Sequence, residues 1–238
     1  MSDDKVLTKE IAEQFLADNR SVDLSEFTEI KDAAAEILAY HCGGLWLDGL
    51  KNLSDYSASC FSKQEGSLSL NGLTQLSWEG AESLGSRVEV SGSWISLNSV
   101  RTLSNDAAHC LARWTGTLYL EGLEDLSGDC PGHMQLMTAM VNNYEDEENP
   151  LCFGKLSGLP NDIAELLSRY QHSLILDGIT ELSDEAIKSL SNSTGPFLSL
   201  DGMTSLSDEA AESLRTFGGQ LYLNGLDTLS DLAAKSLS

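Results

Sequence analysis

The most reactive side chains in the sequence belong to five cysteines and four histidines. Two pairs are immediate neighbours, His41 with Cys42 and His109 with Cys110. Adjacent residues on a helix point about 100° apart. Neither pair is therefore arranged to hold one metal ion between its two side chains.

Cys130 and His133 do have the spacing of metal ligands. However, Cys130 aligns with positions that other parts of the chain fill with alanine, such as Ala107 and Ala210, which predicts a buried place on a helix. A structural zinc site needs four ligands, and no second ligand pair is visible. We therefore predict no metal site and no cofactor. An enzyme with a cryptic site at Cys130 and His133 is the third of three function classes, after the protein-binding and carbohydrate-binding modules considered below.

Catalytic motifs are absent from the sequence. It contains no P-loop, GxGxxG or GxSxG string. Aspartate and glutamate together number 37, so any choice of an acid and base pair would be arbitrary. The cysteines are odd in number, scattered and without a CxxC pair, which predicts free thiols and a reducing compartment. We predict a protein that is not an enzyme.

The charge of the chain excludes two classes of partner. The formal net charge is −23 at pH 7, whereas nucleic acids and anionic membranes select cationic surfaces. No run of 18 apolar residues occurs, and the N-terminus lacks a basic and apolar leader. We therefore expect a cytoplasmic protein, with a secreted protein or a fragment of a longer chain as the alternatives.

A repeating unit decides the fold. LILDGITELSDEAIKSL from Leu174, LSLDGMTSLSDEAAESL from Leu198 and LYLNGLDTLSDLAAKSL from Leu221 align without a gap. The same frame predicts nine strands, which begin at Val22, Leu45, Leu68, Ile95, Leu118, Leu151, Leu174, Leu198 and Leu221. Most starts are 23 residues apart, and two longer spacings place insertions near 86–93 and 131–149. We predict a single domain over 1–238, with a helical half-repeat over 1–21 and nine repeats over 22–238.

Each repeat has two halves. The first, LxLxGL, alternates apolar and polar residues, which predicts a short strand with one buried face. The second, LSDEAAESL, predicts a helix whose cap side chain accepts a backbone hydrogen bond and whose first turn is acidic. The predicted caps are Thr8, Ser54, Ser77, Ser104, Ser127, Ser183, Ser207 and Ser230. Because a helix start follows each Asn-Gly or Asp-Gly dipeptide, we interpret these dipeptides as turns that end a strand rather than as hairpins.

The pattern LxLxGLxxLSDEAAxxL resembles a leucine-rich repeat, closest to the cysteine-containing class. One position departs from that class, because the ladder residue that is usually Asn or Cys is apolar here: Leu50, Leu73, Val100, Leu123, Leu156, Ile179, Met203 and Leu226. Many members of the class carry an F-box before the repeats. The 21 residues before Val22 leave no room for one, so the resemblance implies a curved α/β solenoid used for protein binding, without the ligase-adaptor function.

Spacing explains why such a solenoid curves. Parallel strands stack about 4.8 Å apart, whereas packed helices need about 8–10 Å between their axes. We therefore predict parallel strands on a concave face and short helices on a convex face. The nearest rival, an antiparallel all-β domain, would contain little helix.

Alternation along each strand predicts which side chains line the concave face. The apolar candidates for partner binding are Trp46, Trp94, Tyr119, Ile175, Phe197 and Tyr222, and the acidic ones are Asp48, Glu121, Asp177 and Asp201. Tryptophan and tyrosine are enriched among binding anchors, although they also favour strands for their cross-strand pairing. We predict a monomeric module that binds a protein of basic or mixed charge, and the alternative is a carbohydrate or cell-wall binder.

The insertion near 131–149 is the largest irregular feature. Met134, Met137 and Val141 are spaced as on one face of a longer amphipathic helix. Met134 aligns with Leu111 and Leu214, so we predict that the methionines fill the core. The acidic run from Glu145 to Glu148 then predicts a solvated loop.

Overall fold

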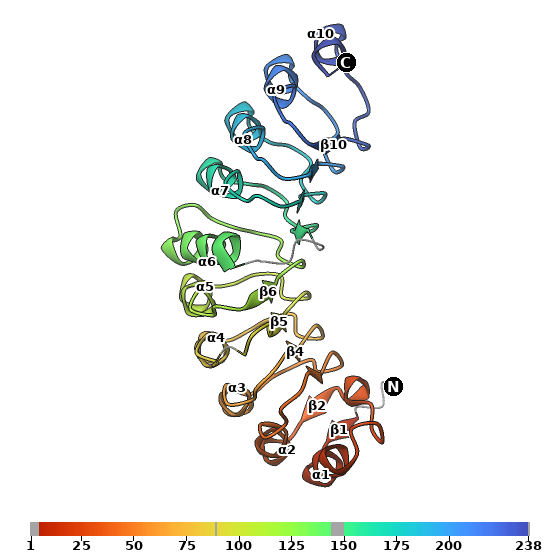
Figure 1. Ribbon diagram of the computed structural model, residues 1–238, viewed down its shortest axis with the longest axis vertical. Coiled ribbons are helices and arrows are strands. Elements are labelled where there is room, and N and C mark those ends of the chain that lie inside the picture. The colour runs from red at the N-terminus through yellow and green to blue at the C-terminus, as the bar shows by residue number, and fades with distance from the viewer. Residues whose placement is uncertain (1–4, 89, 144–149, 238) are drawn as a thin grey trace. The chain divides into compact units, whose positions relative to one another are not determined.

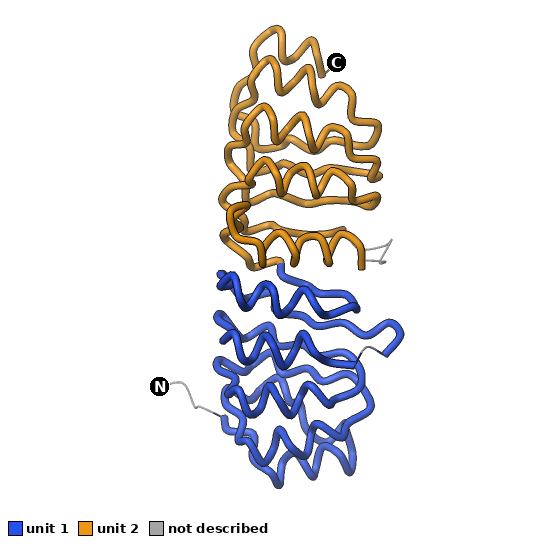
Figure 2. Tube along the Cα trace, turned by 90° about the vertical axis from the view of Figure 1, so that its left-hand side faces the viewer, with its two compact units in different colours: residues 1–120 blue, residues 121–238 orange. Residues whose placement is uncertain are grey.

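The computed structural model describes residues 5–88, 90–143 and 150–237. Contacts divide the chain into two compact units, Met1–Leu120 and Glu121–Ser238 (Figure 2). In each unit short strands and short helices alternate along the chain, with the strands on one side and the helices on the other (Figure 1). The strand pairs are parallel. The fold is an α/β repeat solenoid, as the sequence predicts.

Unit 1 contains a two-stranded and a four-stranded sheet in its described residues. Its strands are β1 (Val6–Leu7), β2 (Glu29–Ile30), β3 (Leu45–Trp46), β4 (Leu68–Ser69), β5 (Trp94–Ser96) and β6 (Thr117–Tyr119). Its helices are α1 (Lys9–Ala17), α2 (Asp32–Leu38), α3 (Asp55–Phe61), α4 (Trp78–Gly85) and α5 (Asn105–Leu111), together with the 3-10 helix η1 (Leu24–Glu26).

Unit 2 contains a four-stranded sheet in its described residues. Its strands are β7 (Leu151–Cys152), β8 (Leu174–Ile175), β9 (Phe197–Ser199) and β10 (Gln220–Tyr222). Its helices are α6 (Pro131–Asn143), α7 (Asn161–Leu167), α8 (Asp184–Leu190), α9 (Asp208–Leu214) and α10 (Asp231–Ser236).

The sheets confirm eight of the nine predicted strands, of which four begin at the predicted residue and four begin one residue earlier, as β5 does at Trp94. Leu68 pairs with Leu45 on one side and with Ile95 on the other, so the insertion near 86–93 does not shift the register. In unit 2 the pairs join Leu151, Leu174, Leu198 and Leu221 in the same way. The side chains of these residues point into the core, and so do the side chains two positions later in each strand. The complete burial of Leu45 and Leu47 illustrates this pattern.

The strand predicted at Val22 is wrong, because the 3-10 helix η1 takes its place. The carboxylate of Asp23 accepts hydrogen bonds from the backbone N–H and the hydroxyl of Ser25. An aspartate that bonds two residues ahead stabilises a turn in competition with extended backbone. The first predicted repeat therefore lacks its strand.

Six of the eight predicted helix caps are confirmed. In each, the serine side chain accepts the backbone N–H three residues later: Ser54, Ser77, Ser104, Ser183, Ser207 and Ser230. Thr8 precedes α1 but its side chain accepts no such bond. The cap predicted at Ser127 is wrong, because α6 begins four residues later at Pro131, a residue that suits the first position of a helix.

The capping serines also join neighbouring helices. The hydroxyl of Ser77 donates to the carboxylate of Asp55 at the start of the preceding helix, with an oxygen separation of 2.6 Å. Ser183 donates in the same way to the side chain of Asn161, also at 2.6 Å. The acidic first turns predicted from the sequence therefore accept hydrogen bonds from the next repeat, in addition to any interaction with their own helix dipole.

The insertion near 131–149 does form a longer helix, α6, but with a different buried face. His133, Leu136, Met137 and Met140 are buried, whereas Met134 is only half-buried. The placement of Met134 in the position of Leu111 is therefore wrong, because α6 begins later than the repeat frame predicts. Residues 144–149, which include the predicted acidic loop, lie outside the described residues.

All five cysteines are free thiols in the structure. Cys60 and Cys110 are buried, and burial raises the pKa of both thiols. Among the described residues, none of the helices is long and apolar enough to cross a membrane.

Candidate functional site

The candidate site is the strand-side surface of each unit, which we define by Trp46, Trp94 and Tyr119 in unit 1 and separately by Ile175, Phe197 and Tyr222 in unit 2. Each of these side chains is exposed or half-buried, whereas the leucine and isoleucine residues beside them in the strands are buried, except at Tyr222, whose neighbours Leu221 and Leu223 are half-buried. The alternation predicted from the sequence is thus present in the structure.

In unit 1 the three aromatic side chains form a row across β3, β5 and β6. The ring centroids of Trp46 and Trp94 are 6.5 Å apart, and those of Trp94 and Tyr119 are 6.1 Å apart. Both contacts are edge-to-face, the geometry that aromatic pairs prefer. Trp46, at the end of this row, keeps 55% of its surface exposed.

In unit 2 the structure pairs two of the predicted aromatic residues. Phe197 and Tyr222 lie edge-to-face with their ring centroids 5.7 Å apart, and Tyr222 remains 40% exposed. Ile175 lies on β8 opposite Cys152 of β7 and is half-buried. Burial raises the pKa of the Cys152 thiol, and the nearby carboxylates of Glu121 and Asp177 raise it further, although a backbone hydrogen bond at Gly154 opposes them.

Three of the four predicted acidic residues, Asp48, Asp177 and Asp201, accept hydrogen bonds from the next repeat. Asp48 accepts hydrogen bonds from the hydroxyl of Ser69 and from the backbone N–H of Asn71, both in the next repeat. Asn71 does the same for Ser96 at 2.6 Å and for the backbone N–H of Asn98 at 2.9 Å. We call this set of contacts the Asp/Asn ladder.

The ladder continues within unit 2. Asp177 accepts from the Ser199 hydroxyl at 2.6 Å and from the backbone N–H of Asp201 at 3.1 Å. Asp201 accepts from the backbone N–H of Asn224 at 2.8 Å. The sequence analysis did not predict that these side chains join the repeats, although the sequence contains a signal for it. Asp or Asn recurs two residues before the apolar position of Leu50 and its equivalents, and serine recurs at the matching place of the next strand.

We expect Asp177→Ala to lower the free energy of unfolding by about 2 kcal/mol, because it leaves the Asp201 N–H and the Ser199 hydroxyl without their acceptor. Asp177→Asn keeps an acceptor oxygen, as Asn71 does naturally, and should cost less than about 1 kcal/mol. Urea unfolding followed by circular dichroism measures both. An equal loss for the two variants would mean that the negative charge, and not the acceptor, stabilises the ladder.

A pocket of about 470 Å³ lies beside Trp46 in unit 1. Residues of α1, η1 and the segment around β3 line it, among them Phe15, Asp23, His41 and Asp48. Sequence reasoning missed the pocket, because η1 occupies the place of a predicted strand. The available signal was the Gly43–Gly44 pair next to an outward-facing tryptophan.

Cys130, which precedes α6, and His133 within it make structural hydrogen bonds in the described residues. The Nδ1 atom of the buried His133 accepts the backbone N–H of Ser127 at 3.0 Å. The carbonyl of Cys130 accepts the backbone N–H of Met134. No group of three or more His, Cys, Asp or Glu side chains in the described part of the chain is placed to hold a metal ion.

Comparisons with known proteins assign neither a family nor a function to the chain. No protein-family model matches the chain, and no curated protein matches it. Among solved structures, an internalin (inlF) from Listeria monocytogenes str. 4b F2365 is similar, with 14% sequence identity and a TM-score of 0.43. The match covers 90% of this chain and 66% of the internalin chain. Similarity at this level does not identify a partner, so the function must be argued from this chain's own surface.

Proposed function

We propose that the chain is a non-enzymatic module that binds a protein partner of basic or mixed charge on its strand-side surface. The observation that carries this proposal is the unit 1 row of Trp46, Trp94 and Tyr119. The edge-to-face contacts of this row leave part of each ring exposed to water, and tryptophan and tyrosine are the residues most enriched among interface anchors. Their mutual edge-to-face packing also holds them in place before a partner arrives.

The charge of the chain supports the chemistry of the partner. The formal net charge is −23, and a basic surface would be attracted to it over a distance of about 10 Å at 0.1 M salt. The ladder acids Asp48, Asp177 and Asp201 lie along the same strand side as the aromatic residues. Their primary function in the fold does not remove their negative charge from the surface that the partner approaches.

We expect Trp94→Ala and Tyr119→Ala each to weaken partner binding by more than about 1 kcal/mol. Trp78→Ala is the matched control, because Trp78 is an aromatic residue of unit 1 that is 50% exposed at the start of α4, on the helix side. Affinity capture with the wild-type chain would supply the partner. Titration of that purified partner against each variant then gives the change in Kd.

The controls decide between this proposal and its rivals. Thermal unfolding of each variant shows whether weaker binding follows from a loss of fold, since Trp94 contacts two rings and its removal should cost about 1 kcal/mol of stability. Loss of binding by Trp78→Ala or by changes in α6, with silent strand-side variants, would contradict the proposal. Binding to glycans that persists in high salt would favour a carbohydrate binder instead.

A further inference from the structure

The pocket beside Trp46 is large enough to receive a side chain of a partner. Its volume of about 470 Å³ falls within the roughly 300–1,000 Å³ typical of pockets that hold small ligands. It opens next to the unit 1 row, because Trp46 belongs to both. A partner that covers the aromatic row would therefore also meet this pocket at the Trp46 end of the row.

Three rings form the aromatic part of the pocket. Phe15 and His41 lie edge-to-face with their centroids 5.2 Å apart, and Trp46 lines the same space. Two glycines set this arrangement. A Cβ atom at Gly43 would lie 2.8 Å from the His41 ring, and one at Gly44 would lie 2.7 Å from the Trp46 ring. Only glycine at these positions lets both rings lie this close to the backbone.

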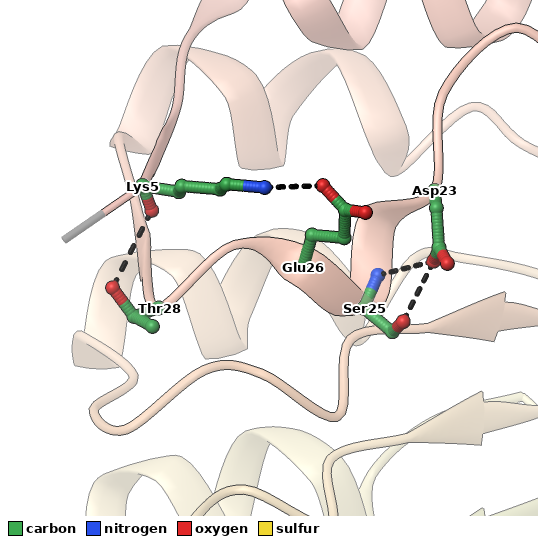
Figure 3. A network of polar contacts seen from close by, with 5 residues as sticks. All are labelled: Lys5, Asp23, Ser25, Glu26 and Thr28. Carbon is green, nitrogen blue, oxygen red and sulfur yellow. Dashed lines mark hydrogen bonds and ion pairs between the residues drawn. The ribbon is translucent and has the colours of Figure 1, made fainter. Parts of the chain in front are cut away.

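Two carboxylates form the polar part. Asp23 is held by the backbone N–H and the hydroxyl of Ser25, at 2.9 and 2.6 Å (Figure 3). Asp48 is held by its ladder contacts to Ser69 and Asn71. Both acceptors are thus fixed in direction by hydrogen bonds within the fold and need little reordering to receive a ligand.

The electrostatics of the pocket favour a cation. The hydrogen bonds from Ser25 hold the pKa of Asp23 below its usual range, so this side chain is ionised at neutral pH. Burial lowers the pKa of His41 below 6.5, and a backbone hydrogen bond at Gly44 offsets only part of that effect. His41 is therefore neutral at pH 7. No lysine or arginine lines the pocket, and nearby Lys5 forms an ion pair with Glu26 (Figure 3).

We propose that this pocket receives an arginine side chain of the protein partner, with the guanidinium group against Trp46 and its N–H groups directed to Asp23 and Asp48. A guanidinium is planar, stacks on aromatic faces and donates from several edges at once, which suits a pocket that both rings and carboxylates line. A lysine ammonium lacks the planar face. This inference rests on the proposed function and names the chemistry that the strand-side surface recognises.

The test uses small probes on the intact chain. N-acetyl-arginine amide is titrated into the ¹⁵N-labelled protein, with the citrulline amide as its uncharged counterpart of the same shape and the lysine amide as the other cation. We expect saturable shifts of the Trp46 indole N–H, assigned through Trp46→Phe, and of the backbone amides near Asp23. The citrulline amide should bind about 10-fold more weakly, since it loses the charge-assisted hydrogen bonds, and the lysine amide about 3-fold more weakly.

Variants show where the probe binds. Asp23→Asn combined with Asp48→Asn keeps the acceptor oxygens that the fold needs and should weaken the arginine probe about 10-fold. Asp201→Asn is the matched control, because it makes the same change at a ladder residue that does not line the pocket. Urea unfolding verifies that all variants are folded. Shifts that do not saturate, equal binding of the citrulline or lysine amide, or an equal effect of Asp201→Asn would overturn the inference.

The outcomes also separate this inference from the proposed function. Loss of the partner by Trp94→Ala and Tyr119→Ala, together with no response of the pocket to the arginine probe, would leave the binding surface in place and remove the arginine site. Saturable and selective probe binding, together with silent Trp94→Ala and Tyr119→Ala variants, would keep the pocket and contradict the aromatic row as the contact surface.

Discussion

Gly202→Ala is expected to lower the free energy of unfolding of unit 2 by about 3 kcal/mol or more. A Cβ atom at this position would lie 2.1 Å from the carbonyl oxygen of Asp177 and 2.8 Å from that of Ile179. Both atoms belong to the backbone of the preceding repeat, which cannot move without opening the stack. Overpacking a tight interior costs about 1–3 kcal/mol, and a contact with fixed backbone lies at the upper end of that range or beyond it.

The matched control is Gly158→Ala in the same unit. No atom lies within 4 Å of a Cβ built on Gly158, so this substitution should change stability by less than about 0.5 kcal/mol. Urea unfolding of both variants, followed by circular dichroism, gives the two free energies. Similar values for Gly202→Ala and Gly158→Ala would mean that the repeats slide apart easily and that the close approach is not required.

The sequence alone did not predict that Gly202 is needed for close contact with the preceding repeat. The Asn-Gly and Asp-Gly dipeptides are typical of turns with positive φ, and we predicted a turn at each. The turn is present, since the N–H of Met203 donates to the carbonyl of Leu200. However, only Gly66 and Gly92 have positive φ among the described residues. The glycine is needed for contact with the preceding repeat, a property of two repeats that no single turn reveals.

The strand register was predictable because it depends on a pattern within each repeat. Alternating leucines such as Leu174 and Leu176 must share a face, and a 23-residue period brings equivalent strands into alignment. The helix starts were predictable for the same reason, since Ser183 and the residue that it caps, Ala186, are three residues apart. Local rules predict local structure.

The contacts that the sequence did not predict are mostly contacts between repeats. The Asp/Asn ladder joins Asp48 to Asn71, 23 residues away, and the aromatic row joins residues from three strands. Interactions between repeats depend on which neighbour each side chain reaches, and the alternation pattern does not contain that information. At Val22 the local side-chain bond of Asp23 outweighed a weak strand pattern. The alternation pattern predicted which strand residues are exposed or half-buried, but it did not predict the hydrogen bonds that Asp48 and Asp177 accept from the next repeat.

The second large effect is expected at Arg87, whose side chain is only 5% exposed. Its Nη2 atom donates to the carbonyls of Gln64 and Gly66 at 3.0 and 2.7 Å, and to the side-chain oxygen of Gln64 at 2.6 Å. The guanidinium also lies over the ring of Trp114, 5.6 Å from its centroid. Burial lowers the pKa of Arg87 to about 10, so the group is still charged at neutral pH.

Two opposing terms decide the result of changing Arg87. Burying the charge is unfavourable, as its lowered pKa shows, and the Nε and Nη1 atoms have no hydrogen-bond partner among the described residues. Removing the side chain relieves this cost but leaves two buried acceptors of Gln64 and the half-buried carbonyl of Gly66 without this donor, and it opens a cavity beside Trp114. An unpaired buried polar group costs about 1–3 kcal/mol. The unpaired acceptors and the cavity together outweigh the relief, so we expect Arg87→Ala to cost about 3 kcal/mol.

Arg87→Gln should recover most of this loss, because the preceding repeat uses a glutamine for the same task. Gln64 donates from its side-chain nitrogen to the carbonyl of Gly43 at 2.6 Å, one repeat before the contact of Arg87 with Gly66. A neutral amide at 87 restores a donor without a buried charge, so we expect it within about 1 kcal/mol of the wild type. Urea unfolding with Trp114 fluorescence as the reporter measures both variants. If Arg87→Ala and Arg87→Gln are equally destabilised, the stacking on Trp114, and not the hydrogen bonds between repeats, is what Arg87 contributes to unit 1.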